Sequence, residues 1–256
     1  MGSSGTIVLS RLEFDVLWER EELPRRHVAI EVASPGATHT ERRAIVAETM
    51  AGLEQRGLAK RERAVAELAD WLTLLAHPQV SVDSWVWTDR TIRSLTAASG
   101  SQAVLAVVDG PEVWLIPVRD SAVAEAAVSV AGDTPAGAGY SVNLETDVLL
   151  DADQAAGSDP REFALSLGRA GVPTDDANVI ANMTNDMQVR GQFGVTRRQR
   201  DQRMRRADRV VCFHDTPYGR YLYLARANND GRLWSTITPA DNRRLVTCVE
   251  ELLDEV

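Results

Sequence analysis

Three side chains that could perform covalent chemistry lie close together in the C-terminal part of the chain. Cys212, His214 and Asp215 supply a thiol, an imidazole and a carboxylate, the groups that a cysteine nucleophile and its base require. On a strand, the side chains of residues i and i+2 share a face about 7 Å apart, whereas a nucleophile and its base need about 3 Å. The spacing therefore favours a packing role for Cys212 and a turn-flanking role for His214. A thiol-dependent or small-molecule-binding enzyme that uses this pair is the alternative function.

Four acidic residues between Asp151 and Glu162 fall on positions of a calcium-binding loop. Ala155 occupies a ligand position of that loop, and Ala156 stands where its sharp turn requires glycine. We therefore interpret the segment as an acidic linker that leads into a helix N-terminus. The two cysteines have neither a metal-ligand spacing nor a disulfide framework. We expect no metal and no cofactor.

The segment from Arg197 to Arg206 holds six arginines among ten residues. A nucleic-acid site would add aromatic residues for base stacking and a positive field over a broad face. This run contains no aromatic residue, and the whole chain has a formal charge of −9 and a pI near 5.0. The run is interpreted as a solvated connection or as a contact for an acidic partner, and nucleic acid is not expected.

Composition indicates a globular protein without a membrane span. The 256 residues are 44% apolar and 25% charged, and no apolar run is long enough to cross a bilayer. Residues 1–6 lack the basic start and apolar core of an export signal. These features, with the sparse cysteines, predict a cytoplasmic protein.

Capping residues and apolar periodicity divide the chain into expected elements. In the first half these are a helix from Ser10 to about Leu23, a strand over Val28–Val32, helices over Thr38–Gly57 and Val65–Ala76, a long strand over Gln79–Thr88, a polar connection over Asp89–Ser101, a hairpin of Gln102–Asp109 with Glu112–Val118, and a helix over Asp120–Val130. The second half begins with a loop over Gly132–Gly139, a strand over Tyr140–Leu144, a helix capped by Ser158 or Asp159 and a helix capped by Thr174.

The segment from Met187 to Pro239 predicts four antiparallel strands that a terminal helix follows. Turn residues at Asp215–Gly219 and at Asn228–Gly231 separate its apolar runs. Thr238, followed by Pro239, predicts the start of the helix.

The order of elements recurs in the two halves, about residues 1–139 and 140–256. Each half is expected to contain a helix, a long strand, a polar or basic connection, a hairpin and a further helix. We therefore predict an α+β fold in which two pseudo-twofold related halves pair their strands into one central antiparallel sheet. The second half is expected to have an extra strand, Arg232–Ile237.

Several segments also resemble one protein family. They are L-S-R-L-E-F-D-V-L-W at Leu9–Trp18, V-A-S-P-G-A at Val32–Ala37, G-Q-F-G at Gly191–Gly194, the arginine-rich link, D-T-P-Y-G-R-Y at Asp215–Tyr221 and T-P-A-D at Thr238–Asp241. In their order and spacing they are similar to the EspG family, the cytosolic chaperones of the ESX, or type VII, secretion systems of actinobacteria. The resemblance covers nearly the whole chain, and it implies a single EspG-like domain over residues 1–256 with a central sheet flanked by two helical bundles.

The resemblance also implies a function. Such a chaperone binds the helical tip of the PPE protein in a PE–PPE heterodimer, keeps it soluble and directs it to export; small WXG-type helical hairpins are alternative clients. The family has no catalytic residues to carry over, so no enzyme activity is expected. The protein is expected to be a monomer or a weak dimer without a bound nucleotide.

The candidate partner-binding residues come from their positions on the expected strands. They are Arg190, Gln192 and Phe193 on the long strand of the second half, and Arg232, Trp234 and Thr236 on the last strand. The last three share one strand face, which places an aromatic anchor beside polar groups. Trp85 and Trp87 share a face of the first half's long strand, where they either join the core or line an exposed surface.

Overall fold

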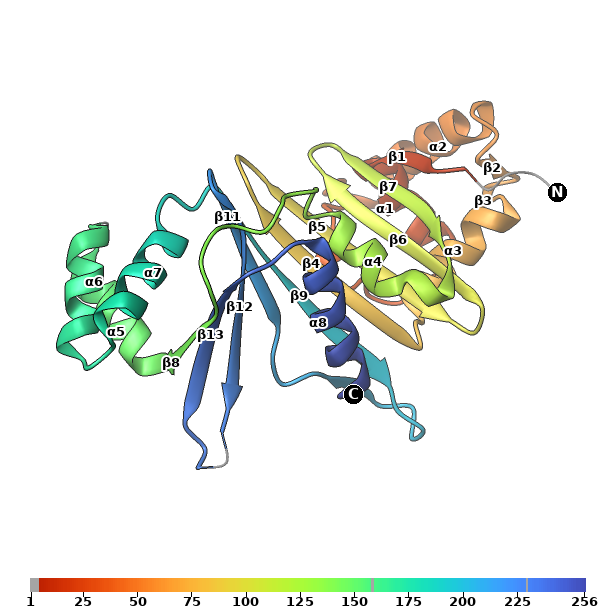
Figure 1. Cartoon of the computed structure of the whole chain (residues 1–256). Coiled ribbons are helices and arrows are strands. Elements are labelled where there is room, and N and C mark those ends of the chain that lie inside the picture. The colour runs from red at the N-terminus through yellow and green to blue at the C-terminus, as the bar shows by residue number, and fades with distance from the viewer. Residues whose placement is uncertain (1–4, 158, 229) are drawn as a thin grey trace. The chain divides into compact units, whose positions relative to one another are not determined.

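The computed structural model describes residues 5–157, 159–228 and 230–256. Residues 1–4, Ser158 as the alternative helix cap and Asn229 of the expected turn lie outside the described residues. The protein combines helices with a large antiparallel β-sheet (Figure 1). It divides into two compact units. The first runs to Trp85 and includes Arg90–Val130 and Thr196–Arg205, and the second comprises Val86–Asp89, Ala131–Val195 and Arg206–Val256.

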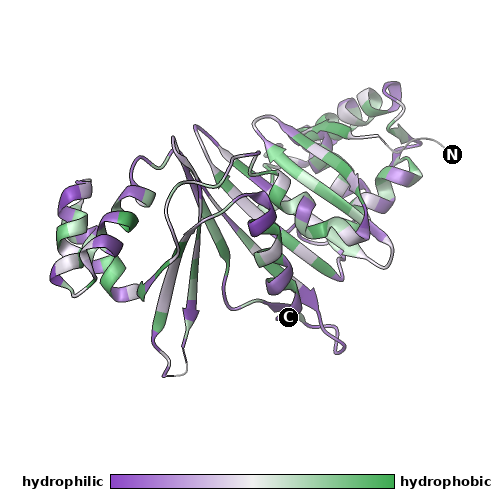
Figure 2. Ribbon diagram, in the orientation of Figure 1, coloured by the Kyte–Doolittle hydropathy of each residue, from purple (hydrophilic) through white to green (hydrophobic). Residues whose placement is uncertain are grey.

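In the first unit, five strands lie in the order β1-β7-β6-β5-β4. The strands are β1 (Ile7–Ser10), β4 (Val80–Trp87), β5 (Thr91–Ser99), β6 (Gln102–Asp109) and β7 (Glu112–Val118), and the helices are α1 (Arg11–Arg20), α2 (His39–Gln55), α3 (Ala66–Ala76) and α4 (Val123–Ser129). Helices α1 to α3 pack on one sheet face, where Leu72, Leu95, Val104 and Leu115 are fully or almost fully buried. Strands β6 and β7 are correspondingly hydrophobic along most of their length (Figure 2).

Capping signals correctly predicted the starts of α1 and α2 in the first unit. Ser10 and Glu13 form the reciprocal cap of α1, in which the Glu13 amide donates to Ser10 Oγ at 3.1 Å and the Ser10 amide donates to Glu13 Oε2 at 2.7 Å. Thr38 Oγ1 likewise accepts from the Glu41 amide at the start of α2. Each bond satisfies a backbone donor that the helix itself leaves without a partner.

Two predictions in the first unit were wrong. Val28–Ile30 forms a 3-10 turn, η1, because the His27 ring accepts from the Ala29 amide and ends the extended conformation. Asp89–Ser101 is not a connection, since Thr91–Ser99 is the strand β5, which pairs with β6 from Arg93 opposite Val108 to Ser99 opposite Gln102. A short hairpin of β2 (Ala59–Lys60) and β3 (Arg63–Ala64) was not expected.

In the second unit, the strands lie in the order β9-β11-β12-β13-β8. The strands are β8 (Val142–Glu145), β9 (Val189–Arg198), β11 (Val211–Thr216), β12 (Gly219–Ala227) and β13 (Leu233–Pro239), and the helices are α5 (Thr146–Ala156), α6 (Pro160–Arg169), α7 (Thr174–Thr184) and α8 (Asn242–Asp254). Strand β10 (Met204–Arg206) pairs with β9, and residues 196–205 of this hairpin belong to the first unit. The four predicted strands between Met187 and Pro239 are confirmed as β9, β11, β12 and β13.

Two of the three predicted helices of the second unit differ from expectation at their starts, whereas α6 is capped by Asp159 as predicted. The terminal helix does not begin at Thr238, because Thr238 and Pro239 still pair with β12 in strand β13. Asp241 caps α8 by accepting from the Arg244 amide at 2.9 Å. Pro173, without a side-chain hydrogen bond, stands at the cap of α7 in place of Thr174. Helix α5 was not predicted.

Helices α5 to α7 and helix α8 cover opposite faces of the second unit's strands. Tyr221 and Ile237 belong to the apolar cluster formed with α5, α6 and α7. Arg226, which points to the other face of β12, pairs with Glu251 of α8 at 2.8 Å. Successive side chains of each strand point to opposite faces of the sheet, so every second residue packs against α5 to α7.

A buried arginine anchors the loop that opens the second unit. Arg220 is fully buried, and its Nε and Nη2 donate to the carboxylate of Asp215 at 2.7 and 2.8 Å. The same guanidinium donates to the carbonyl oxygens of Ala131 and Gly132 at 2.7 and 3.1 Å, and it lies over the ring of Phe213. The buried charge is thereby paired and hydrogen-bonded, as a charge away from water requires.

Two glycines let this loop approach β12 closely. A Cβ on Gly137 would lie 2.2 Å from the ring of Tyr221, and one on Gly219 would lie 2.6 Å from the Gly137 backbone. The backbone amide of Gly137 donates to Arg220 O, and the amide of Arg220 donates to Pro135 O. Only residues without a side chain fit at these two positions.

Candidate functional site

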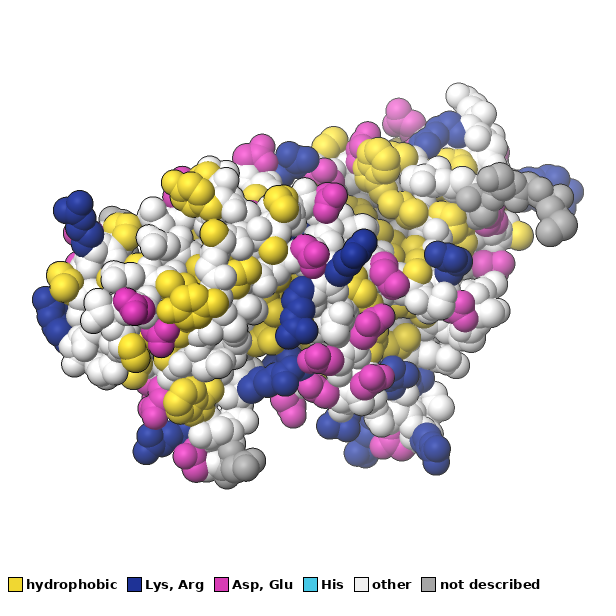
Figure 3. Space-filling model, viewed as in Figure 1, with side chains coloured by type: hydrophobic (Ala, Val, Ile, Leu, Met, Phe, Trp, Pro, Cys, Tyr) yellow, Lys and Arg dark blue, Asp and Glu magenta, His cyan; other side chains and the backbone are white. Residues whose placement is uncertain are grey.

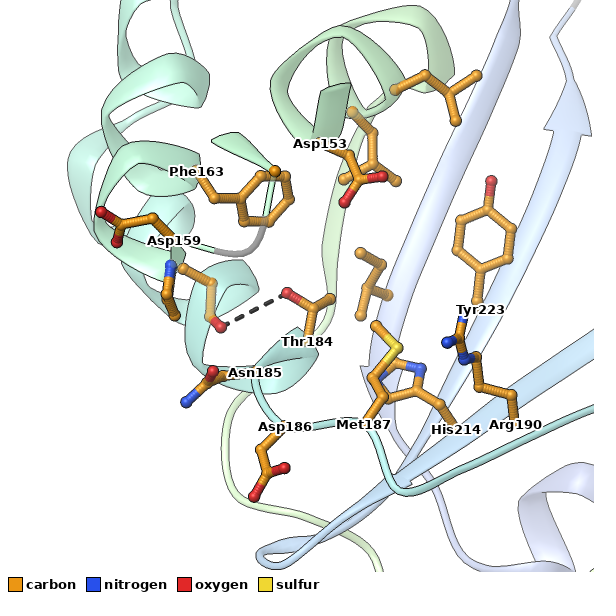
Figure 4. A pocket seen from close by; sticks show the side chains of 16 residues that line it. Asp153, Asp159, Phe163, Thr184, Asn185, Asp186, Met187, Arg190, His214 and Tyr223 are labelled. Carbon is orange, nitrogen blue, oxygen red and sulfur yellow. Dashed lines mark hydrogen bonds between the residues drawn. The ribbon is translucent and has the colours of Figure 1, made fainter. Parts of the chain in front are cut away.

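The candidate site is a groove of about 640 Å³ in the second unit, which we call the second-unit groove. It lies between helices α5 to α7 and the strands β9, β11, β12 and β13. Figure 4 shows Asp153, Asp159 and Phe163 reaching it from the helical side and Arg190, His214 and Tyr223 from the strands. The remaining lining residues are Leu149, Leu150, Gly157, Pro160, Ala181, Thr184, Asn185, Asp186, Met187 and Ile237.

The floor of the groove is apolar, and two apolar side chains at its rim face solvent. Phe163, Ala181 and Ile237 are buried in the cluster beneath the three helices. Leu150 is 57% exposed and Met187 is 37% exposed. Exposed apolar side chains beside an apolar floor indicate a surface that another molecule can cover.

The helical wall is positioned by local signals in the sequence. Asp159 caps α6 by accepting from the Arg161 amide at 2.9 Å, and Pro160 occupies the first turn, where no amide hydrogen is needed. At the end of α7, Thr184 Oγ1 donates to the carbonyl oxygen of Ile180 at 2.9 Å. Asp186 then adopts a left-handed conformation with φ of 56°, which turns the chain from the helix into β9.

Strand register positions the other wall. Arg190 of β9 lies opposite His214 of β11, which in turn lies opposite Tyr221 of β12. His214 Nε2 donates to the Met183 carbonyl oxygen at 2.8 Å, and burial lowers the pKa of His214. The imidazole is therefore held neutral and its ring is fixed between helix and sheet.

The predicted cysteine and histidine pair is not arranged as a nucleophile and base. Burial raises the pKa of the Cys212 thiol to about 11, so the thiol is protonated at neutral pH. His214 bonds to Met183, and Asp215 bonds to Arg220 on the opposite strand face. Within the described residues, no group of three His, Cys, Asp or Glu side chains could hold a metal ion.

The six candidate partner-binding residues fall on two opposite faces of the second unit's strands. Arg190, which is exposed, and Gln192, which is half-buried, lie on the face of α5 to α7. Arg232, Trp234 and Thr236 lie on the face that α8 covers, at the edge of the sheet where β13 pairs with β8. Of the six, the structure brings Arg190 alone into the second-unit groove.

Phe193 does not lie on a surface. Its side chain is fully buried and stacks on Phe213 with ring centroids 5.7 Å apart. The prediction that it contacts a partner is corrected to a packing role.

The other three residues form a small surface that we call the edge patch. Arg232 pairs with Glu145 at 2.8 Å, and Thr236 Oγ1 donates to Asn143 Oδ1 at 2.6 Å. Trp234 is 37% exposed between them.

The two tryptophans of β4 have different environments. Trp85 is half-buried beneath the guanidinium of Arg93, which lies 5.8 Å from the ring centroid. Trp87 is 41% exposed.

Sequence reasoning missed most of the groove. Leu150 and Asp153 belong to α5, and the helical spacing of Val148, Leu149 and Ala152 is the sequence signal that indicates this helix. Asp186 and Met187 lie in a turn without a distinctive pattern.

Together these features define a class, a mixed α/β protein with a large antiparallel sheet and an apolar-floored surface groove. The chain belongs to the EspG family, whose sequence model matches residues 10–251. This finding confirms the resemblance seen in the sequence.

A solved structure shows the same fold. It is that of the Mycobacterium tuberculosis type VII secretion system chaperone EspG5 in complex with the PE25–PPE41 dimer, with a TM-score of 0.76 and 18% sequence identity. The match covers 98% of this chain and 96% of that chain. No curated protein sequence matches significantly. In the part of the chain that the structure describes, every helix is too short or too polar to cross a bilayer.

Proposed function

We propose that this protein is a cytosolic specificity chaperone of an ESX, or type VII, secretion system. It binds the helical tip of the PPE protein in a PE–PPE heterodimer, keeps that tip soluble and directs the dimer to export. Family membership and the fold shared with EspG5, which was solved with PE25–PPE41, support this proposal. The observation that carries it for this chain is the apolar floor of the second-unit groove with Leu150 and Met187 exposed at its rim.

The groove suits the end of a helical hairpin. Its volume of about 640 Å³ lies within the range of about 300–1,000 Å³ typical of binding pockets, and its open rim admits a protein segment. A client tip exposes apolar side chains that would otherwise associate with one another. Covering them in the groove removes apolar surface of both proteins from water, which stabilises the complex.

Binding by the proposed mechanism requires no covalent chemistry. The protonated thiol of Cys212 and the neutral, bonded imidazole of His214 support a packing role for both residues. The protein is therefore a binding protein rather than an enzyme. It acts stoichiometrically, as a monomer or weak dimer, and WXG-type helical hairpins are its alternative clients.

We further propose that the two halves of the chain, about residues 1–139 and 140–256, are pseudo-twofold repeats of one plan, each with its own helical bundle. When the short hairpin β2–β3, the 3-10 turns and the short strand β10 are left out, the element order β1-α1-α2-α3-β4-β5-β6-β7-α4 corresponds to β8-α5-α6-α7-β9-β11-β12-β13-α8. The strand orders β1-β7-β6-β5-β4 and β8-β13-β12-β11-β9 correspond in the same way. The predicted strand Arg232–Ile237 is present as β13, and with β5 in the first half we propose β7 as its counterpart, so that by this correspondence neither half has an extra strand.

A charge in the groove tests the proposed function. The chain is co-expressed with a PE–PPE pair from the same genome, and the complex is captured through a tag on this protein. Leu150→Asp is expected to abolish or strongly reduce capture, because it places a charge on the apolar rim. Leu165→Asp is the matched control, since Leu165 is 56% exposed on α6 and does not line the groove. Equal capture by both variants and the unmodified protein would contradict the proposal.

A further inference from the structure

Negative charge is concentrated around the second-unit groove. Residues 146–187, which include α5, α6 and α7, carry eight carboxylates and two arginines, a formal charge of −6 out of −9 for the chain. The 197–206 hairpin, by contrast, is rich in arginine (Figure 3). Two thirds of the chain's net negative charge therefore belongs to residues 146–187.

Three of these carboxylates line the groove itself. Asp153 comes from α5, Asp159 from the start of α6 and Asp186 from the turn after α7. Arg190 is the one permanently cationic side chain among the described lining residues, and His214 is neutral because burial lowers its pKa. The helical wall is thus acidic, and the strand wall carries a single positive charge.

Two of the three carboxylates are available to a partner. Asp159 is engaged as the helix cap of α6. The carboxylates of Asp153 and Asp186, by contrast, accept no hydrogen bond and form no ion pair within the described residues, and both residues are exposed. A cation brought to either of these side chains would meet a carboxylate without displacing an internal partner.

We propose that the client segment which enters the groove carries an apolar anchor flanked by lysine or arginine. This inference rests on the proposed function and adds the charge of the segment that the groove accepts. The apolar side chain covers the floor formed by Phe163 and Ile237, while a flanking cation on either side lies against Asp153 or against Asp186. The same carboxylates repel a tip flanked by glutamate or aspartate, so they select between clients of similar shape.

Two synthetic helical-hairpin peptides test the inference directly. Both have the same leucine-containing tip and a disulfide that closes the hairpin, and they differ only in whether lysine or glutamate flanks the leucine. Fluorescence anisotropy of labelled peptide, at low and at high salt, gives Kd for each. The lysine peptide is expected to bind about tenfold tighter at low salt, and this ratio is expected to shrink as salt screens the charges.

Matched variants assign the effect to the groove. The double variant Asp153→Asn, Asp186→Asn is expected to bring the two affinities within about threefold of each other, since each exposed charge contributes modestly. Asparagine tolerates the left-handed conformation of residue 186, so the turn is kept. Asp151→Asn makes the same change on α5 outside the groove and is expected to leave the ratio unchanged.

The outcomes separate the two proposals. Equal affinities, or tighter binding of the glutamate peptide, would overturn the charge selectivity while the groove remained a docking site. Lysine preference that survives in the double variant would also overturn it. Binding of neither peptide, together with capture of the PE–PPE pair unaffected by Leu150→Asp, would overturn the proposed function and this inference with it.

Discussion

At the scale of single residues, the environment of a side chain decides whether it can take part in catalysis or only packs in the fold. Cys212 and His214 have the residue types of a catalytic pair, but burial keeps the thiol protonated and a backbone carbonyl occupies the imidazole. Their spacing in sequence already argued for this result, because i and i+2 positions on a strand hold side chains too far apart for proton transfer.

The thiol of Cys212 is expected to react slowly. Since burial moves its pKa from 9.0 to about 11, the thiolate fraction near pH 8 falls about 100-fold relative to an ordinary cysteine. Iodoacetamide labelling of a Cys248→Ser variant measures Cys212 in isolation, and labelling in urea provides the unfolded reference. A native rate close to the urea rate would revive the thiol-enzyme alternative.

Residue patterns predicted part of the candidate site. Arg190 was identified because alternation placed it on a polar strand face, and it lines the groove. The same alternation could not say that Phe193 is covered, since the residues that bury it come from other strands and helices. Asp153 and Asp186 become neighbours of one groove only when three helices fold onto the strands.

At the scale of elements, capping residues predicted the starts of α1, α2 and α6 but not those of α7 and α8. A cap acts through bonds to amides within three residues, so a short segment contains all the information that it needs. The cap of α1 was predicted for this reason. Strand β5 was missed because Arg93, Ser94 and Thr96 make it look polar, although Ser94 and Thr96 are fully buried within the sheet.

The cap of α8 can be tested by substitution. Asp241→Ala is expected to lower the free energy of unfolding by about 1 kcal/mol, because the Arg244 amide loses its acceptor and the helix N-terminus loses a negative charge. Asp254→Ala removes the same charge from the other end of α8, where it opposes the helix dipole, and is expected to be neutral or slightly stabilising. Urea unfolding followed by circular dichroism measures both, and equal losses would contradict the capping role.

At the scale of the whole molecule, family membership and the fold agree with the resemblance seen in six short segments. Those segments contain turns, a strand end and helix starts, and their order along the chain was more informative than any one of them. Composition predicted a globular protein. It did not predict the strand order, because that order depends on pairing between residues far apart in sequence.

The edge patch is proposed as a second contact surface for the client. If Trp234 is an anchor there, Trp234→Ala combined with Arg232→Glu is expected to weaken client binding at least tenfold. Trp114→Ala is the matched control, because Trp114 is 39% exposed on β7 of the first unit, against 37% for Trp234. Titration of the purified PE–PPE pair by calorimetry measures the change, and an unchanged Kd would remove the edge patch from the proposal.

The loop anchored by Arg220 restricts how this part of the molecule can vary. Lysine would keep the positive charge but not the planar fork that reaches Asp215 and the loop carbonyls together. Alanine at Gly137 would meet the Tyr221 ring, so a tolerated replacement there calls for a smaller side chain at 221 as well. Substitutions in residues 131–139 and in residues 215–221 are therefore expected to occur together, and a homologue without the arginine is expected to have a different loop.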